Sequence, residues 1–291
     1  MLKSRKLERY SFILPVVVLL LAVTIFPLIY SLAVSLNVWD LRLNVFWDFV
    51  GLKNYGKALF GDARFWHSLW VTLRLGIPAI LLQFALGFFL ALLLDRGLRG
   101  TRLFNTLLIL PVMVSPMVAA MIFRMLYHEK YGAINALLSY MGLPRDTTWL
   151  ADRTLSSVAI ILVDTWQWTP LVMMILLAGL KSISPEQIEA ARVDGAHGLQ
   201  IFWYITLPLL RMSMIVALLI RFIDIIKLFD SVFILTGGGP GSTNETISMY
   251  IYLVGFRYFR MGYASALSYL LLIFTSMLST LFIRVTLRRE M

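Results

Sequence analysis

The sequence SPEQIEAARVDGAHGLQIFWYITLP, residues 184–208, interrupts a chain that is otherwise dominated by apolar runs. Pro185 suits the first position of a helix, where its missing N–H costs nothing, and Ser184 with Gln187 fits a capping box. Gly195 is placed to end that helix in the left-handed conformation. A second helical segment follows and runs into the next apolar run. The stretch therefore predicts a short helix-turn-helix between two apolar segments.

The composition on either side of this stretch is that of a membrane protein. Hydrophobic residues make up 59% of the 291 residues and charged residues only 14%, which is far from the balance of a soluble domain. The apolar residues come in runs of about 20 or more, the length that carries a helix across about 30 Å of hydrocarbon. We expect an all-α membrane protein, with a single transmembrane domain over residues 1–291. Its six spans lie near residues 12–36, 68–94, 103–126, 155–180, 208–235 and 263–285.

The distribution of Lys and Arg indicates how these spans are oriented. An even number of spans puts both termini on one side, and the cytoplasmic side carries the excess of basic residues. The side of the termini collects twelve: Lys3, Arg5, Lys6, Arg9, Arg96, Arg99, Arg102, Lys181, Arg192, Arg284, Arg288 and Arg289. The other side collects nine: Arg42, Lys53, Lys57, Arg64, Lys130, Arg145, Arg153, Arg257 and Arg260. Both termini and the stretch 184–208 are therefore expected in the cytoplasm.

Several other classes of protein are disfavoured by simple counts. The net charge of +10 comes from basic residues beside apolar runs, which orient helices and do not form a nucleic-acid patch. The chain has no cysteine, and its three histidines stand apart from one another, so neither thiolate nor histidine metal spacing is present. The first apolar run is too long for a signal peptide and is expected to be a retained helix.

The polar stretch has the anatomy of a docking element. Ala190 and Ala191 are small enough for another backbone to approach closely, while Glu189, Arg192 and Asp194 offer directional polar contacts at the rim. An amphipathic helix that inserts into a partner groove is built in this way. An interfacial helix that only joins two spans has the same features, so physical reasoning leaves both interpretations open.

Ionisable and aromatic residues inside the spans are candidates for a substrate pathway. The fifth span holds Arg221, Asp224, Lys227 and Asp230 at intervals of three, which suits pairing along one helix as well as lining of a cavity. The fourth span holds Asp164, Trp166, Gln167 and Trp168 just before Pro170, which is expected to bend the helix. Aromatic faces beside a carboxylate and an amide suit a sugar. The tryptophans could equally pack against lipid or neighbouring helices.

The spacing within the polar stretch resembles a known motif. Glu189-Ala190-Ala191, three residues, Gly195, nine residues, Ile205, one residue and Leu207-Pro208 is similar to the coupling loop of permease subunits of binding-protein-dependent ABC importers. That resemblance implies a type I importer permease fold. It also implies contact with a cytoplasmic nucleotide-binding subunit through Glu189, Ala190, Ala191, Asp194, Gly195, Ile205, Leu207 and Pro208.

A second resemblance narrows the family. Leu228-Phe229-Asp230, Leu235-Thr236, Gly238-Gly239-Pro240 and Glu245-Thr246 look like a stretch of sugar-type permeases, the group of the maltose and glycerol-phosphate permeases. The larger maltose-type subunit has extra N-terminal helices and a large outer domain, which this chain lacks. The resemblance implies a second, different permease, two ATPase copies, an extracytoplasmic solute-binding protein, and a sugar, oligosaccharide, glycoside or polyol phosphate as substrate. It also implies a bacterial or archaeal cytoplasmic (inner) membrane.

The sequence further predicts what this subunit does not do. It has no G-x-x-x-x-G-K-[ST] phosphate loop, so ATP and Mg²⁺ are expected on the partner and no cofactor on this chain. The main alternative is a stand-alone secondary transporter or facilitator, which would use the charged residues of spans four and five and leave the 184–208 pattern unexplained. An intramembrane enzyme is disfavoured because the usual nucleophile and metalloprotease motifs are absent from the sequence.

Overall fold

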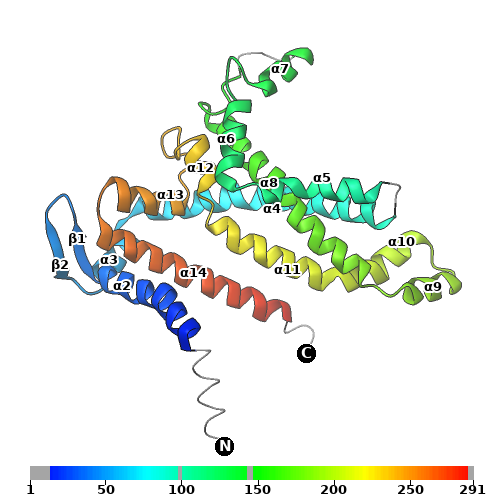
Figure 1. The fold of residues 1–291 in the computed structure, drawn as a ribbon, viewed down its shortest axis with the longest axis horizontal. Coiled ribbons are helices and arrows are strands. Elements are labelled where there is room, and N and C mark those ends of the chain that lie inside the picture. Colours follow the sequence, from blue (N-terminus) through cyan, green and yellow to red (C-terminus); the bar gives the residue numbers. More distant parts are fainter. Residues whose placement is uncertain (1–13, 98–99, 143–146, 288–291) are drawn as a thin grey trace, which may run out of the picture. The chain divides into compact units, whose positions relative to one another are not determined.

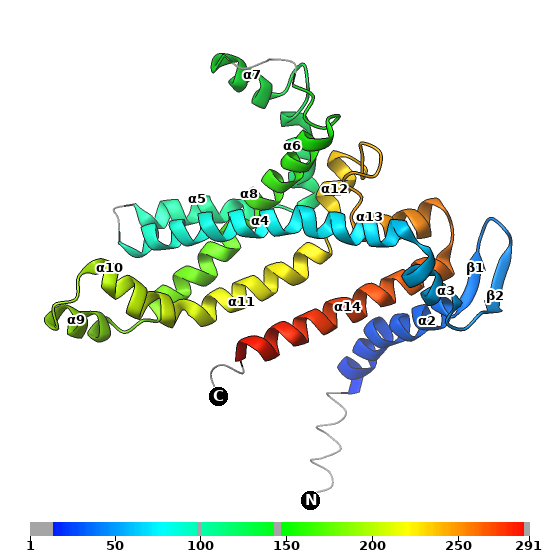
Figure 2. The same ribbon diagram turned by 180° about the vertical axis from the view of Figure 1, so that it is seen from behind.

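The computed structural model describes residues 14–97, 100–142 and 147–287. It contains two compact units, one made of residues 1–66 and 250–276 and the other of residues 67–249 and 277–291. Figures 1 and 2 show the ribbon from opposite sides. The expected start of the first span at residue 12 lies outside the described residues, as do Lys3, Arg5, Lys6, Arg9, Arg99, Arg145, Arg288 and Arg289. The single transmembrane domain stays a prediction.

The chain is helical almost throughout. In order, its elements are η1 (Leu21–Ile25), α2 (Phe26–Ser35), β1 (Asn37–Asp40), β2 (Val45–Phe49), α3 (Lys53–Gly56), η2 (Lys57–Gly61), α4 (Ala63–Asp95), α5 (Thr101–Met113), α6 (Pro116–Leu126), α7 (Ala133–Tyr140), α8 (Arg153–Lys181), α9 (Pro185–Val193), α10 (Gly198–Ile201), η3 (Phe202–Thr206), α11 (Leu207–Ile226), α12 (Asp230–Leu235), α13 (Ile247–Tyr252), η4 (Leu253–Arg257) and α14 (Met261–Leu287). The η segments are π-helical turns that continue their neighbouring helices. The all-α membrane fold expected from the apolar runs is confirmed.

The described helices correspond to the predicted spans as long single helices, as one bent pair and as the shorter helix α11. Four of them are long and apolar enough to cross a bilayer: Leu14–Ser35, Ala63–Asp95, Arg153–Lys181 and Met261–Arg284. Helices α5 and α6 pass the same test together, but they are bent by 97°. Helix α11 is 20 residues long and carries Arg211, Arg221 and Asp224. The described residues therefore give four spans, or five when the bent pair is counted as one. Helix α11 is not among the helices that pass the test, and its place as a span stays a prediction.

Two predicted spans are not continuous helices. The prediction for residues 103–126 was wrong in this respect, because Val114 is extended (φ −81°, ψ 134°) and α6 restarts at Pro116. A proline disfavours the helical conformation at the residue before it, and Ser115 has ψ 137°. The span 208–235 was also drawn too long. Helix α11 ends at Ile226, and the chain leaves helical geometry before α12 begins at Asp230.

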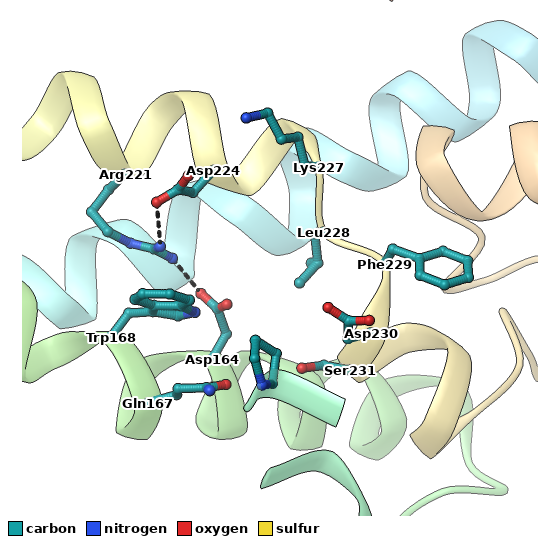
Figure 3. Close-up of a pocket in the computed structure, with 11 residues that line it drawn as sticks. Asp164, Gln167, Trp168, Arg221, Asp224, Lys227, Leu228, Phe229, Asp230 and Ser231 are labelled. Atoms are coloured by element: carbon teal, nitrogen blue, oxygen red, sulfur yellow. Dashed lines mark hydrogen bonds and ion pairs between the residues drawn. The ribbon is translucent and has the colours of Figure 1, made fainter. Parts of the chain in front are cut away.

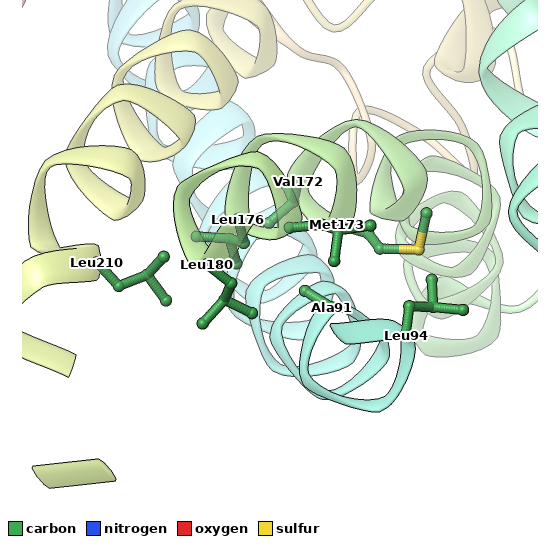
Figure 4. Packing of buried hydrophobic residues seen from close by; sticks show 8 residues of the cluster. Ala91, Leu94, Val172, Met173, Leu176, Leu180 and Leu210 are labelled. Carbon is green, nitrogen blue, oxygen red and sulfur yellow. The ribbon is translucent and has the colours of Figure 1, made fainter. Parts of the chain in front are cut away.

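The apolar core of the second unit lies where α8 meets α4 and α11. Buried Ala91 of α4, Val172, Met173 and Leu176 of α8, and Leu210 of α11 belong to one cluster, which Figure 4 shows from close by. Small residues let these helices approach closely, as is typical of membrane proteins. A Cβ on Gly87 of α4 would lie 3.0 Å from the backbone nitrogen of Met173, and one on Gly179 of α8 would collide with Ser213 of α11.

In the first unit, α2 and α14 run side by side, with the hydroxyl of Tyr269 donating to the carbonyl of Leu28. The connection after α2 forms a two-stranded antiparallel hairpin, in which Asn37 pairs with Phe49 and Asp40 with Val45. Asn44 occupies the turn at φ +52°, a conformation that asparagine tolerates better than most residues. This hairpin was not expected from the sequence.

Asp62 ties the first unit together. One carboxylate oxygen accepts hydrogen bonds from the backbone nitrogens of Arg64 at 3.0 Å and Phe65 at 3.2 Å, which caps the start of α4. The other accepts from the hydroxyls of Tyr250 at 2.6 Å and Tyr263 at 2.5 Å. Burial alone raises the pKa of Asp62, but the hydrogen bonds from the two tyrosines and the backbone outweigh it and hold the pKa below its usual value.

Candidate functional site

The ends of several helices enclose a cavity of about 130 Å³ in the second unit. Figure 3 shows its walls, which come from the start of α6, the middle of α8, the end of α11 and the start of α12. The lining residues are Pro116, Asp164, Gln167, Trp168, Arg221, Asp224, Lys227, Leu228, Phe229, Asp230 and Ser231. Irregular backbone at membrane depth occurs where it is buried in protein or lines a cavity. Both interruptions of the predicted spans, at residues 114–115 and 227–229, lie next to this cavity.

A buried ion network crosses one wall of the cavity. Arg221 of α11 is 1% exposed, and its Nη2 lies 3.0 Å from the Oδ2 of Asp164 on α8. Its Nη1 lies 3.4 Å from the carboxylate of Asp224, one turn further along α11. The guanidinium carbon also sits 4.8 Å from the ring centre of Trp168, within the range of a cation–π contact. The charges of Arg221, Asp164 and Asp224 are thus compensated by direct contacts.

Gln83 of α4 completes this network. Its side chain is fully buried, its Nε2 donates to Asp164 Oδ2 at 2.7 Å, and its Oε1 accepts from Arg221 Nε at 2.8 Å. One amide therefore satisfies both members of the ion pair, as a buried pair requires to be stable. We did not single out Gln83 from the sequence, although a lone amide inside an apolar run is a usable signal.

The structure brings together six of the seven predicted pathway residues. These are Asp164, Gln167, Trp168, Asp224, Lys227 and Asp230, all of which line the cavity. Gln167 also donates to the carbonyl of Val114 at 2.9 Å, and so holds the bend between α5 and α6. Trp166 does not line this cavity. It is 40% exposed and packs edge-on against Phe123 of α6, with ring centres 5.1 Å apart.

The expected charge ladder along one helix is present only in part. Arg221 and Asp224 pair on α11, but Lys227 is the residue at which the helix ends and Asp230 starts the next one. Interhelical pairing and cavity lining therefore coexist at this site. Pro170 lies inside α8, which remains one helix of 29 residues.

The stretch 184–208 folds as the expected helix-turn-helix, with one correction. Ser184 makes no capping bond to the backbone and donates instead to the carboxylate of Glu186. A capping box forms later, between His197 and Gln200 at the start of α10. The predicted capping box between Ser184 and Gln187 does not form, because Glu186 is one residue nearer to Ser184 and takes its hydroxyl. Gly195 has φ +86°, as expected for the residue after the helix.

The turn after α9 is closed by backbone bonds. Ala196 N donates to Ala191 O at 2.9 Å and Gly195 N to Arg192 O at 3.1 Å, which is the Schellman pattern. A depression of about 330 Å³ lies beside this turn, lined by Asp194, Gly195, Ala196, Gln200, Ile201, Tyr204 and Ile205. Glu189 and Ala190 are exposed on α9. Large apolar side chains are exposed nearby, including Val193 at 87% and Tyr204 at 79%, which is typical of a surface that a partner covers.

The motif residues are thus presented by three elements and the turn after the first of them. Glu189, Ala190 and Ala191 lie on α9, with Asp194 and Gly195 in the turn that follows it, while Ile205 belongs to η3 and Leu207 and Pro208 begin α11. Among the described residues, no group of three or more histidine or carboxylate side chains comes together as a metal site would require.

Comparisons with known proteins agree with this architecture. Residues 83–290 match the family model of the binding-protein-dependent transport system inner membrane component. A probable ABC transporter permease protein of Sinorhizobium fredii is 37% identical over 92% of this chain and 86% of its own length. The trehalose/maltose transport system permease protein MalF of Thermococcus litoralis is 35% identical over 87% of this chain and 83% of its own.

A solved structure shows the same fold. It is a bacterial ABC transporter involved in the import of the acidic polysaccharide alginate, and the match has a TM-score of 0.84 at 24% identity over 98% of this chain and 96% of that one. The family match covers well over half of the chain and includes both the cavity and the stretch 184–208. This chain therefore belongs to the binding-protein-dependent transport system inner membrane components, the permease subunits of ABC importers.

Proposed function

We propose that this chain forms half of the pathway by which a carbohydrate-like solute is imported at the expense of ATP. The observation that carries the proposal is the cavity in which Trp168 stands beside Gln167 and Asp164. A sugar offers apolar faces to an aromatic ring and hydroxyl edges to amides and carboxylates. The names of the curated relatives support this class, because they include a trehalose/maltose and a trehalose transport permease.

The charges of the cavity narrow the class further. Three carboxylates and two cations line it, namely Asp164, Asp224, Asp230, Arg221 and Lys227. Arg221 is already engaged by two of the carboxylates, so the half-pathway carries a surplus of negative charge. Like charges in a site of low dielectric repel strongly. Of the sugars, glycosides and polyol phosphates that the sequence suggests, this wall favours the uncharged ones.

The stretch 184–208 is the proposed contact with the ATPase subunit. Glu189, Ala190, Ala191, Asp194, Gly195, Ile205, Leu207 and Pro208 would dock into a cleft of a nucleotide-binding subunit, with two such subunits in the complex. ATP and Mg²⁺ would bind and react there, and this chain would catalyse no reaction itself. Apolar side chains are exposed beside α9. This favours a surface that a partner covers rather than a loop that faces solvent. The basic residues near the termini support placing this side in the cytoplasm of a bacterium or archaeon.

A second, homologous permease would supply the other half of the pathway as a heterodimer partner, and an extracytoplasmic solute-binding protein would deliver the sugar. The bilayer is the solvent of the complex, and nucleic acid has no part in it. Membership of a binding-protein-dependent family supports these partners.

Transport in proteoliposomes tests the proposal. The complex is reconstituted with its partner subunits, and uptake of labelled trehalose or maltose is compared between the unaltered chain and Trp168→Ala. Losing one aromatic face is expected to weaken uptake by about three- to tenfold. Trp166→Ala is the matched control, since that ring lies outside the cavity. Equal uptake in all three proteins, or sugar uptake by the chain without an ATPase, would count against the proposal.

A further inference from the structure

The unwound residues 227–229 at the cavity wall are held by two hydroxyl groups from further along the chain. Thr246 Oγ1 donates to the carbonyl oxygen of Leu228 at 2.7 Å, and Ser248 Oγ donates to that of Ile226 at 3.3 Å. Leu228 lines the cavity, and Ile226 is the last residue of α11. Two side chains that lie 18 and 22 positions away in the sequence therefore bind the backbone of the cavity wall.

These carbonyl groups need partners because α11 stops here. The last carbonyls of a helix have no partner within it, and an acceptor that is buried without one is costly. Ile226 and Leu228 are only 6% and 8% exposed, and Thr246 is fully buried. The two hydroxyls thus replace the backbone N–H groups that a continuing helix would have supplied.

The segment that carries these hydroxyls is fixed to two helices of the same unit. The backbone nitrogen of Ile247 donates to Thr72 Oγ1 on α4 at 2.9 Å. On α8, Ser156 Oγ accepts from the side-chain amide of Asn244 at 2.8 Å, and Ser157 Oγ donates to the oxygen of that amide at 2.7 Å. Asn244, Ile247 and Ser156 are fully buried. The hydroxyls are therefore presented from a support formed by α4 and α8 rather than by α11.

The hydroxyl of Thr246 makes the shorter of the two contacts. It donates to Leu228 and also accepts from the backbone nitrogen of Met249 at 3.4 Å. Serine can make the same two bonds, whereas valine, which is of nearly the same size as threonine, can make neither. Substitution by these two residues therefore separates the hydrogen bond from the packing of the side chain.

We propose that Thr246 is a positioning residue for the solute cavity, which acts by holding the carbonyl of Leu228. Lys227 and Asp230 stand on either side of the held backbone and line the cavity (Figure 3). The described lining residues do not include Thr246 or Ser248, so both act on a solute through the backbone. Losing the hydroxyl lets the two charged side chains shift without removing either of them. The effect on sugar rests on the proposed function, whereas the placement of the backbone does not.

Thiol labelling at position 228 tests the placement of the backbone without any sugar. The chain has no cysteine, so Leu228→Cys introduces its only thiol, at a buried position that reacts when the segment opens. The complex with its partner subunits is placed in nanodiscs and treated with N-ethylmaleimide, and labelling of this chain is followed by intact mass. Thr246→Val is expected to raise the labelling rate about fivefold, which corresponds to the loss of one hydrogen bond. Thr246→Ser should restore the original rate.

Two further variants complete the labelling experiment. Ser248→Ala removes the longer contact and is expected to raise the rate by about twofold. Thr169→Val is the matched control, since that buried hydroxyl bonds the carbonyl of Thr165 within its own helix, and its rate should equal that of the unaltered chain. A rate that stays the same or falls in Thr246→Val would overturn the proposal.

Uptake of trehalose in proteoliposomes then shows whether the placement matters for transport. Thr246→Val is expected to raise the KM about fivefold while kcat changes by less than about twofold, and Thr246→Ser should recover the KM. A purely structural role would lower the amount of assembled complex and reduce uptake equally at every sugar concentration, which would overturn the proposal. If labelling changes as expected but no variant and no unaltered complex transports sugar, the proposed function fails while the placement of the cavity wall by Thr246 is upheld.

Discussion

The guanidinium of Arg221 lies 3.0 Å from the carboxylate of Asp164, although 57 positions separate them in the sequence. Both side chains are buried, and the fully buried amide of Gln83 contacts each of them. Three helices therefore meet at a single charged contact beside the cavity. Each of the three side chains therefore depends on the other two for its buried polar contacts.

Breaking the ion pair from one side is expected to destabilise the protein strongly. Arg221→Met leaves the buried carboxylate of Asp164 without a counter-charge, at a cost of about 3–5 kcal/mol. Asp164→Asn leaves Arg221 only its longer contact with Asp224 at 3.4 Å, so its loss should be smaller. The double variant Asp164→Asn with Arg221→Met should recover much of that loss, because no isolated charge remains. Thermal unfolding of the purified complex in detergent measures all three, and strictly additive losses would contradict the pairing. Asp224→Asn is the milder control, since that carboxylate is 37% exposed.

Gln83→Leu tests the amide without changing the charge. The leucine cannot donate to Asp164 or accept from Arg221, and each unsatisfied buried group costs about 1–3 kcal/mol. We expect a lower unfolding temperature and altered sugar uptake, because the Arg221–Asp164 geometry at the cavity wall is no longer held. Gln83→Met keeps a flexible chain of similar length but no amide and should behave like leucine. A stable protein with normal uptake in both variants would show that the amide is dispensable.

Gly195→Ala tests the turn of the stretch 184–208. Its φ of +86° disfavours any side chain, at a cost of about 1–2 kcal/mol. The expected result is weaker coupling, seen as less sugar imported for each ATP hydrolysed in proteoliposomes. Gly198→Ala is the matched control, because a Cβ there meets nothing within 4 Å and φ is not positive. An unchanged ratio of transport to hydrolysis in Gly195→Ala would remove the turn from the coupling pathway.

The hydrogen bonds to Asp62 predict a dependence of stability on pH. Since the folded-state pKa of Asp62 is lowered, its contribution is fully present above the ordinary pKa of 3.8 and is lost as the pH falls through the folded value. Asp62→Asn keeps a capping oxygen for α4 but cannot accept from both tyrosines. Its melting temperature should lie below that of the unaltered chain at pH 7, with the gap closing below about pH 4. A gap that stays constant down to pH 3 would contradict a charged Asp62.

Much of the fold followed from apolar run lengths, because a helix in hydrocarbon must satisfy its own backbone. The lengths of these apolar runs do not indicate where a helix bends or ends. Pro111 and Pro116 were visible inside 103–126, but hydropathy alone does not mark a bend. The end of α11 at Ile226 lay inside the predicted span 208–235, because apolar residues resume between Lys227 and Asp230 and continue to Leu235.

The candidate site was predictable residue by residue but not as a set. Asp164, Trp168 and Asp224 stood out as polar or aromatic residues in spans. Gln83 carried a similar signal, as a lone amide inside an apolar run, but was not singled out. Its contacts themselves were not predictable, because its partners lie 81 and 138 positions away and no local pattern encodes such a contact. The hairpin at 37–49 was missed because a short strand between two spans carries little periodicity.

Gly179 is the point at which α8 and α11 touch without room for a side chain. It lies two residues before the end of α8, and α11 begins at Leu207, in the last residues of the stretch 184–208 that joins them. Both ends of that stretch are thus attached to one closely packed helix pair, in which the middle of α8 carries Asp164 and the end of α11 carries Asp224 to the cavity. The unwound residues 227–229 directly follow α11, and Gln167 of α8 holds the bend at residues 114–115 through the carbonyl of Val114. Both interruptions of helical backbone are therefore attached to the same helix pair that the stretch 184–208 connects.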